Sequence, residues 1–258
     1  MAARRAQRAR PASPRSQHFL QPAFAAELVR AAGVGADDLV VDIGAGTGRI
    51  TAELARVAPR VIAIELDRKL ASTLRERWPN VEVVQADAAT FVLPSEPVRV
   101  VANLPFDRTN DLLHALLDDP AIPIRRADLV VEWGLAVKRA LPWPSSVSSV
   151  IWNATYECLL ARRLPPAAFE PAPKVAAGVL VFRRRELPLV APQEIDAYHR
   201  MVARGFRRGL RSVATAEALA RIGAKGSIAR DLDAFQWASL FRLHGTRHRA
   251  SALDSRRW

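Results

Sequence analysis

The chain has 258 residues and half of them are apolar, which is enough for one α/β domain of ordinary size and a smaller second domain. Its single cysteine excludes a disulfide framework and a cysteine-rich metal site, so we expect a reducing compartment, the cytoplasm. No apolar run is long enough to span a membrane, and no apolar segment follows the arginine-rich N-terminus, so we expect neither a membrane span nor a signal peptide.

The net charge of +12 is concentrated at the two ends of the chain. Residues 1–16 contain five arginines and no acid, and residues 183–258 contain sixteen lysines and arginines against seven acids. Two basic ends predict a polyanionic partner, because each neutralised phosphate releases counterions. The alternative is that these arginines only solvate the surface. Residues 1–15 cannot bury a core, so we expect them to form a basic disordered tail.

From residue 39 onward, short β-branched runs alternate with helical patterns. The expected strands are Leu39–Ile43, Val61–Ile64, Val81–Val84, Val98–Ala102 and Ala127–Val131. The expected helices between them are Thr47–Val57, Lys69–Arg77 and Asp111–Leu117. This alternation predicts βαβ units on a doubly wound, Rossmann-like parallel sheet. We expect Val150–Leu160 and Gly178–Phe182 to form an antiparallel edge, although the first run could equally be a helix.

Beyond residue 183 the strand pattern stops and helical patterns follow. They cover Gln193–Arg207, Ala214–Ile222 and Leu232–Leu243, with glycine and proline signals between them. We therefore expect an α/β domain over residues 16–183 and a small helical domain over residues 184–258.

The first predicted strand runs directly into the glycine-rich turn Gly44–Gly48. Alternate glycines let the backbone turn sharply and approach a ligand at the head of a helix. The G-x-G-x-G spacing differs from the G-x-G-x-x-G of dinucleotide folds, which favours a nucleoside ligand over NAD. Glu65 ends the next strand, where its carboxylate can bind ribose hydroxyls. Asp87 follows the third strand, where it can accept a hydrogen bond from an adenine amine.

The fourth strand is followed by Asn103-Leu104-Pro105-Phe106, at the edge of the sheet where such folds bind ligands. The Asn103 side-chain oxygen and the Leu104 carbonyl can each accept a hydrogen from an amine, and Pro105 fixes the turn without adding a donor. Phe106 offers a flat face on which a base can stack. Alone, this tetrapeptide could be an ordinary β-turn with a buried Phe. Behind a nucleoside site, it predicts chemistry at the exocyclic amine of adenine.

These motifs, in this order, resemble the rRNA adenine N6-methyltransferase family, whose methyl donor is S-adenosyl-L-methionine. Residues 16–20 are similar to its S-Q-N-F-L motif, with His18 in place of Asn, and Phe169–Val175 is similar to its F-x-P-x-P-x-V loop. The resemblance implies a cofactor site formed by Gln17, His18, Leu20, Gly44, Ala45, Gly46, Glu65, Leu66, Asp87, Ala88 and Asn103. It also implies that Asn103 to Phe106 hold the target adenine, with Phe169 on its other face.

Within the family, three features resemble the erythromycin-resistance (Erm) methylases of high-GC, antibiotic-producing bacteria. They are Phe106 in place of Tyr, the segment Val131–Arg139, and Phe235–Phe241 in the short helical tail. Glu132-Trp133-Gly134 departs from that pattern. This resemblance implies mono- or dimethylation of adenosine N6 in protein-free or precursor 23S rRNA, and resistance to macrolide, lincosamide and streptogramin antibiotics.

We expect the basic helical domain 184–258 to bind RNA, and the oligomeric state stays open, with a monomer as the default. We expect no metal, because His244 and His248 have arginine neighbours and are better placed to face RNA or solvent. Three alternatives remain: a 16S rRNA dimethylase acting in ribosome biogenesis, a DNA N6-adenine methyltransferase, and a non-catalytic RNA-binding factor.

Overall fold

The computed structural model describes residues 18–141, 143–144 and 146–254, with the backbone alone for 245–254. The predicted tail, residues 1–15, lies outside this range. The chain folds into two compact units. One extends to Val137 and includes Leu159–Arg183, and the other consists of Lys138–Cys158 and the chain from Arg184 onward. The sequence predicts residues 138–158 as part of the sheet domain, whereas the structure groups them with the helical unit.

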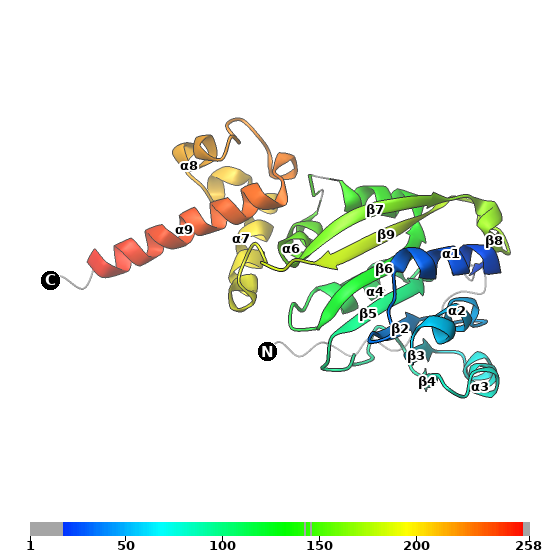
Figure 1. The fold of residues 1–258 in the computed structure, drawn as a ribbon. Coiled ribbons are helices and arrows are strands. Elements are labelled where there is room, and N and C mark those ends of the chain that lie inside the picture. The colour runs from blue at the N-terminus through cyan, green and yellow to red at the C-terminus, as the bar shows by residue number, and fades with distance from the viewer. Residues whose placement is uncertain (1–17, 142, 145, 255–258) are drawn as a thin grey trace. The chain divides into compact units, whose positions relative to one another are not determined.

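The described strands include a seven-stranded sheet of order β4-β3-β2-β5-β6-β9-β7 (Figure 1). Its strands are β2 (Leu39–Ile43), β3 (Arg60–Glu65), β4 (Glu82–Gln85), β5 (Val98–Asn103), β6 (Ile124–Glu132), β7 (Tyr156–Leu164) and β9 (Ala177–Arg184). Strands β4, β3, β2, β5 and β6 are parallel, and β9 runs antiparallel to β6. The predicted α/β sheet with an antiparallel edge is therefore confirmed.

Helices precede and connect these strands; those at residues 49–57, 68–77 and 109–117 correspond to predicted helices, whereas those at 22–32 and 133–140 were not predicted. They are α1 (Pro22–Ala32), α2 (Arg49–Val57), α3 (Arg68–Arg77), α4 (Thr109–Leu117) and α5 (Trp133–Ala140). Helix α3 starts where the Asp67 carboxylate accepts the backbone N–H groups of Lys69 and Leu70. The crossover from β4 to β5, residues 86–97, contains no helix. That part of the sheet is therefore connected by irregular chain alone.

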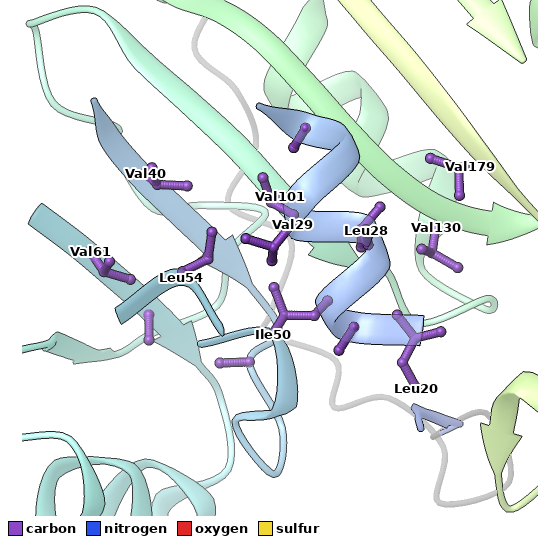
Figure 2. Close-up of a cluster of buried hydrophobic side chains, with 14 of the residues drawn as sticks. Leu20, Leu28, Val29, Val40, Ile50, Leu54, Val61, Val101, Val130 and Val179 are labelled. Carbon is purple, nitrogen blue, oxygen red and sulfur yellow. The ribbon is translucent and has the colours of Figure 1, made fainter. Parts of the chain in front are cut away.

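A buried cluster of the sheet unit lies between the sheet and helices α1 and α2 (Figure 2). Leu28 and Val29 of α1 and Leu54 of α2 are at most 5 % exposed. They belong to one buried cluster with Val40 and Val101 on the central strands. Burying a side chain of this size contributes about 1.5–3 kcal/mol. This packing holds the carboxyl ends of the strands in fixed positions.

A two-stranded sheet joins the N-terminal segment to the loop that follows β7. It consists of β1 (Phe19–Leu20) and β8 (Phe169–Glu170), which pair antiparallel. The N–H of Gln21 donates to the carbonyl of Ala168 at 2.8 Å and extends this connection. The sequence gives no periodic signal for strands this short. Their pairing brings two motifs together that are about 150 residues apart in the chain.

The second unit is helical. It contains α6 (Val147–Thr155), α7 (Ile195–Arg208), α8 (Ala216–Arg221) and α9 (Ala234–Asp254), with 3-10 turns η3 (Pro192–Glu194), η4 (Leu210–Ser212) and η5 (Ala229–Asp231); the sheet unit has η2 (Pro166–Ala168). The run predicted as strand or helix is both, because α6 leads directly into β7. Val150 and Ile151 of α6 pack in one core with Tyr198 and Trp237, which explains why residues 138–158 belong to this unit.

Among the described residues, no helix is both long enough and apolar enough to cross a membrane.

Candidate cofactor and target-base site

A cavity of about 560 Å³ lies at the carboxyl ends of the parallel strands in the sheet unit. It is lined by His18, Phe19, Ile43, Gly44, Gly46, Ile64, Glu65, Leu66, Asp67, Arg68, Leu70, Gln85, Ala86, Asp87, Ala88, Asn103, Leu104, Pro105, Phe106, Arg108 and Leu112. This is the edge at which doubly wound sheets bind ligands, and the volume is that of a nucleoside-sized site. The structure therefore brings most of the predicted site residues to one cavity.

The glycine turn is held against the neighbouring strand. The N–H groups of Gly44 and Ala45 donate to the carbonyl of Ile64 at 2.8 and 3.1 Å. Gly46 has a φ of +58°, and a Cβ built there would lie 2.6 Å from the Phe19 ring. Only glycine fits this position without displacing Phe19. Phe19 was part of a predicted motif, but sequence analysis did not assign it to the site.

Glu65 lies at the end of β3 and is 8 % exposed. Its Oε2 accepts the N–H of Gly46 at 2.7 Å, and its Oε1 accepts the N–H of Asp67 at 2.8 Å. A carboxylate has about four acceptor positions, so each oxygen can accept a further hydrogen bond from a hydroxyl group. The two backbone donors fix the orientation of the carboxylate for that purpose.

Asp42, the acid that precedes the glycine turn, is 1 % exposed. The Thr51 hydroxyl donates to its Oδ2 at 2.6 Å. The pKa of the Asp42 carboxyl is raised to about 7, chiefly by burial and to a smaller extent by the charge of Glu65, against the opposing hydrogen bonds from Thr51. Asp42 does not line the cavity, and its place beneath the turn makes it a supporting residue.

Asp87 follows β4, and its side chain is 7 % exposed. Its Oδ1 accepts the N–H of Ala89 at 3.0 Å, and Arg108 forms an ion pair with the carboxylate at 3.2 Å. Arg108 is the N-cap residue of α4, and sequence analysis missed it. A basic residue two positions after the Asn103–Phe106 tetrapeptide was the available signal, because that position must lie near the same edge of the sheet.

In the Asn103 side-chain amide, the nitrogen has a hydrogen-bond partner and the oxygen has none. Its Nδ2 donates to the backbone carbonyl of His18 at 2.6 Å, which fixes the orientation of the amide. Its Oδ1 is buried and has no hydrogen-bond partner. An unpaired buried acceptor of this kind costs about 1–3 kcal/mol, so its retention indicates a donor from outside the chain.

The backbone of the tetrapeptide is also fixed. The carbonyl of Pro105 accepts the Thr109 hydroxyl at 2.9 Å and the N–H of Arg108 at 3.0 Å, and the N–H of Leu104 donates to Val130 at 3.0 Å. These bonds join the tetrapeptide to the start of α4 and to strand β6. The acceptor groups are therefore held rigidly before any ligand binds.

Three aromatic rings follow one another beside Asn103. The Phe106 ring centroid lies 5.7 Å from that of His18 and 6.2 Å from that of Phe169. Phe169 meets Phe106 edge to face, at 75°, and is only 2 % exposed. Phe169 does not line the cavity and packs on Phe106 in this structure, so the expectation that it covers the other face of the target adenine stays a prediction.

The N-terminal segment forms hydrogen bonds with the loop after β7 and with Arg49 at the start of α2. His18 Nδ1 is 2.8 Å from the carbonyl of Pro171, and Arg49 donates to the carbonyl of Leu20 at 2.8 Å and pairs with Glu170 at 3.1 Å. Of the other predicted site residues, Leu20 and Ala45 are buried beside the cavity without lining it, and Gln17 lies outside the described residues.

In the part of the chain that the structure describes, no three His, Cys, Asp or Glu residues are grouped so that they could hold a metal ion. That His244 and His248 face RNA or solvent stays a prediction, since the side chain of His248 lies outside the described residues.

The sheet order, the glycine turn and the acids at successive strand ends define a Rossmann-like methyltransferase. Within that class the chain belongs to the ribosomal RNA adenine dimethylase family, which matches residues 13–228. This confirms the predicted enzyme class and the resemblance to the family.

Three relatives illustrate the range of the family. The chain is 36 % identical, over 188 residues covering 67 % of each chain, to "Ribosomal RNA small subunit methyltransferase A" of Synechococcus sp. (strain JA-2-3B'a(2-13)). It is 32 % identical, over 81 % of its own length and 71 % of the relative, to "Mycinamicin-resistance protein MyrB" of Micromonospora griseorubida. The crystal structure of the 23S rRNA methyltransferase ErmE superposes with a TM-score of 0.74 and 29 % identity, covering 87 % of this chain and 98 % of that one. The predicted resemblance to the erythromycin-resistance branch is thereby confirmed.

Proposed function

We propose that the protein transfers a methyl group from S-adenosyl-L-methionine to N6 of an adenosine in 23S rRNA. The observation that carries this proposal is the buried, unpaired Oδ1 of Asn103, which lies at the end of β5 beside the cavity. An exocyclic amine is a donor that would satisfy this acceptor.

The residues of the chain explain how a poor nucleophile can react. The lone pair of an adenine amine is delocalised into the ring, so the site must hold the nitrogen in the geometry that favours attack. Asn103 Oδ1 and the Leu104 carbonyl accept the two amine hydrogens, which directs the lone pair toward the methyl donor. Phe106 stacks on the base and replaces the neighbours that it loses when it leaves the RNA. A strong base is not required, because the methylated nitrogen loses its proton readily.

The cavity also fits the proposed cofactor. S-adenosyl-L-methionine supplies the electrophilic methyl group of a sulfonium. Glu65, already oriented by two backbone donors, would accept hydrogen bonds from the ribose hydroxyls, and Asp87 would accept one from the adenine amine. Gly44 and Gly46 let the chain approach the cofactor closely, and Leu66 and Ala88 line the cavity beside the nucleoside. His18 and Asn103 line the same cavity and would lie where the methyl donor meets the target base.

The choice of 23S rRNA depends on the branch of the family. The relatives with resistance functions match over long spans, and the solved 23S rRNA methyltransferase ErmE is covered almost completely at 29 % identity. Phe106 in place of Tyr supports the same branch. The proposed consequence is resistance to macrolide, lincosamide and streptogramin antibiotics. We further propose that the basic segment 184–258 binds the rRNA, and that the protein acts as a cytoplasmic monomer.

The second candidate is methylation of small-subunit rRNA. It is favoured by the 36 % identity to a small subunit methyltransferase A, which exceeds the identity to the resistance relative but covers a smaller part of the chain. The two candidates share the cofactor site and the Asn103–Pro105 part of the tetrapeptide, and they differ in the RNA that is methylated.

The deciding experiment measures transfer of labelled methyl groups to protein-free 23S rRNA, to 30S subunits and to DNA, followed by mass spectrometry of the modified nucleotide. We expect N6-methylated adenosine in 23S rRNA, and a loss of about a hundredfold or more in Asn103→Ala. Asn153→Ala, the same change at an asparagine of the helical unit, serves as the matched control and should keep full activity. Label in 30S subunits alone would select the second candidate, and an active Asn103→Ala would contradict the mechanism.

A further inference from the structure

A second cavity, of about 1090 Å³, adjoins the cofactor cavity in the sheet unit. It is lined by residues 87–95 after β4, by one side of α4, and by the turn after α4. The cavity lies along the crossover from β4 to β5, whose residues 86–97 form no helix. An irregular segment covers a sheet face less completely than a helix does, which accounts for the space.

The two cavities share part of their walls. The residues that line both are Ile43, Ile64, Asp87, Ala88 and Arg108. Three of these are small or apolar, and the other two form the ion pair described above. The partition between the cavities therefore includes one charged pair, Asp87 with Arg108.

This ion pair is nearly buried and multiply bonded. The side chains of Asp87 and Arg108 are 7 % and 12 % exposed. Both terminal nitrogens of Arg108 donate to the carboxylate, at 3.2 to 3.3 Å. Moving the guanidinium away would leave the Asp87 carboxylate charged and unpaired in a poorly solvated place. The ion pair therefore favours the observed position of Arg108. It holds both side chains in place in the wall between the two cavities.

We infer that Arg108 determines the specificity of the cofactor site for an unsubstituted adenine amine. The inference rests on the proposed binding of S-adenosyl-L-methionine, in which the adenine amine donates to Asp87. A substituent that replaces the amine hydrogen donated to Asp87 would point at the carboxylate and at the Arg108 guanidinium bound to it, which lines both cavities. Shortening residue 108 joins the cavities and gives the substituent a place to bind.

Calorimetric titration with two ligands tests this inference without any need for activity. The ligands are S-adenosylhomocysteine and its N6-benzyl derivative, and the readout is the ratio of their dissociation constants. In the unmodified protein we expect the benzyl compound to bind about a hundredfold more weakly, since it must displace a charged hydrogen-bonding group. In Arg108→Ala we expect the ratio to fall below about tenfold.

Two further variants serve as controls, one for the position of the removed cation and one for folding. Arg68→Ala removes a cation that lines the cofactor cavity but not the second cavity, so its ratio should equal that of the unmodified protein. Arg108→Gln is shorter than arginine yet can still donate to Asp87, so it provides a folded variant should Arg108→Ala unfold, and its ratio should also fall. Folding is checked by thermal denaturation.

The outcomes separate this inference from the proposed function. Tight binding of S-adenosylhomocysteine, with the same ratio in the unmodified protein and the Arg108 variants, would overturn the inference alone. Equal binding of both ligands to the unmodified protein would overturn it as well. Failure of S-adenosylhomocysteine to bind the unmodified protein at all would overturn the proposed function and this inference with it.

Discussion

Asp42 gives the most quantitative prediction, because its carboxyl is buried and its pKa is strongly shifted. The residue is 1 % exposed on β2, and burial is the main cause of the rise of its pKa from 3.8 to about 7. In the unfolded chain the same carboxyl ionises near its ordinary value. The folded protein therefore binds one proton more than the unfolded chain between these two pH values.

The sign of the pH dependence follows from this difference. The contribution of Asp42 to stability is fully present below pH 3.8 and is lost as the pH rises to about 7. A shift of this size corresponds to about 4 kcal/mol, since one pKa unit is about 1.4 kcal/mol. This figure is an upper limit, because relaxation around the buried charge lowers the cost of ionisation.

The assay compares the free energy of unfolding of the unmodified protein and of Asp42→Asn at pH 5, 6, 7 and 8. The asparagine cannot ionise, so its stability relative to the unmodified protein should rise by up to about 3 kcal/mol between pH 5 and pH 8, which is the part of the full change that falls in this range. Asp38→Asn is the matched control. Burial favours the neutral Asp38, yet hydrogen bonds from the Gly35 N–H and Arg99 hold the pKa of that carboxyl below its usual value. The difference in the free energy of unfolding between Asp38→Asn and the unmodified protein should therefore not change from pH 5 to pH 8. If the difference for Asp42→Asn does not change either, the reasoning is refuted.

Gly46→Ala should weaken binding of S-adenosylhomocysteine by about tenfold or more, because the new Cβ would lie 2.6 Å from the Phe19 ring on a strained backbone. The control is Gly205→Ala, whose Cβ would lie 2.6 Å from the Trp237 ring: it should lower the thermal stability of the helical unit and leave the affinity unchanged. Equal calorimetric affinities for Gly46→Ala and the unmodified protein would count against the role of the turn. Phe169→Leu should reduce single-turnover methylation more than cofactor binding, because the buried ring supports Phe106; equal losses in both assays would contradict this.

The sheet and its ligand-binding edge are predictable because their signals are local in the sequence. The run Leu39–Ile43 is a strand at the expected residues, and the glycine turn that follows it needs only five consecutive residues to be recognised. Glu65, Asp87 and Asn103 end or follow successive parallel strands, so the topology alone brings them to one edge. The helical pattern after residue 183 likewise predicts the elements of the second unit.

The sequence could not predict which side chains bind one another across long separations. The bond from Asn103 to the His18 carbonyl spans 85 residues, and the pairing that buries Phe169 joins β8 to a strand of only two residues. The ion pair of Arg108 with Asp87 likewise joins two residues that lie 21 positions apart in the chain.

The sequence by itself therefore determined the α/β class, the order of the motifs and the acids available for the cofactor. The tertiary structure decided that Asn103 Oδ1 is left unpaired, that Phe169 packs on Phe106, and that Arg108 closes one wall of the cavity. The physical reason is that periodicity and turn chemistry act between neighbours in the chain, whereas the partner of a buried polar group is chosen by packing between distant segments.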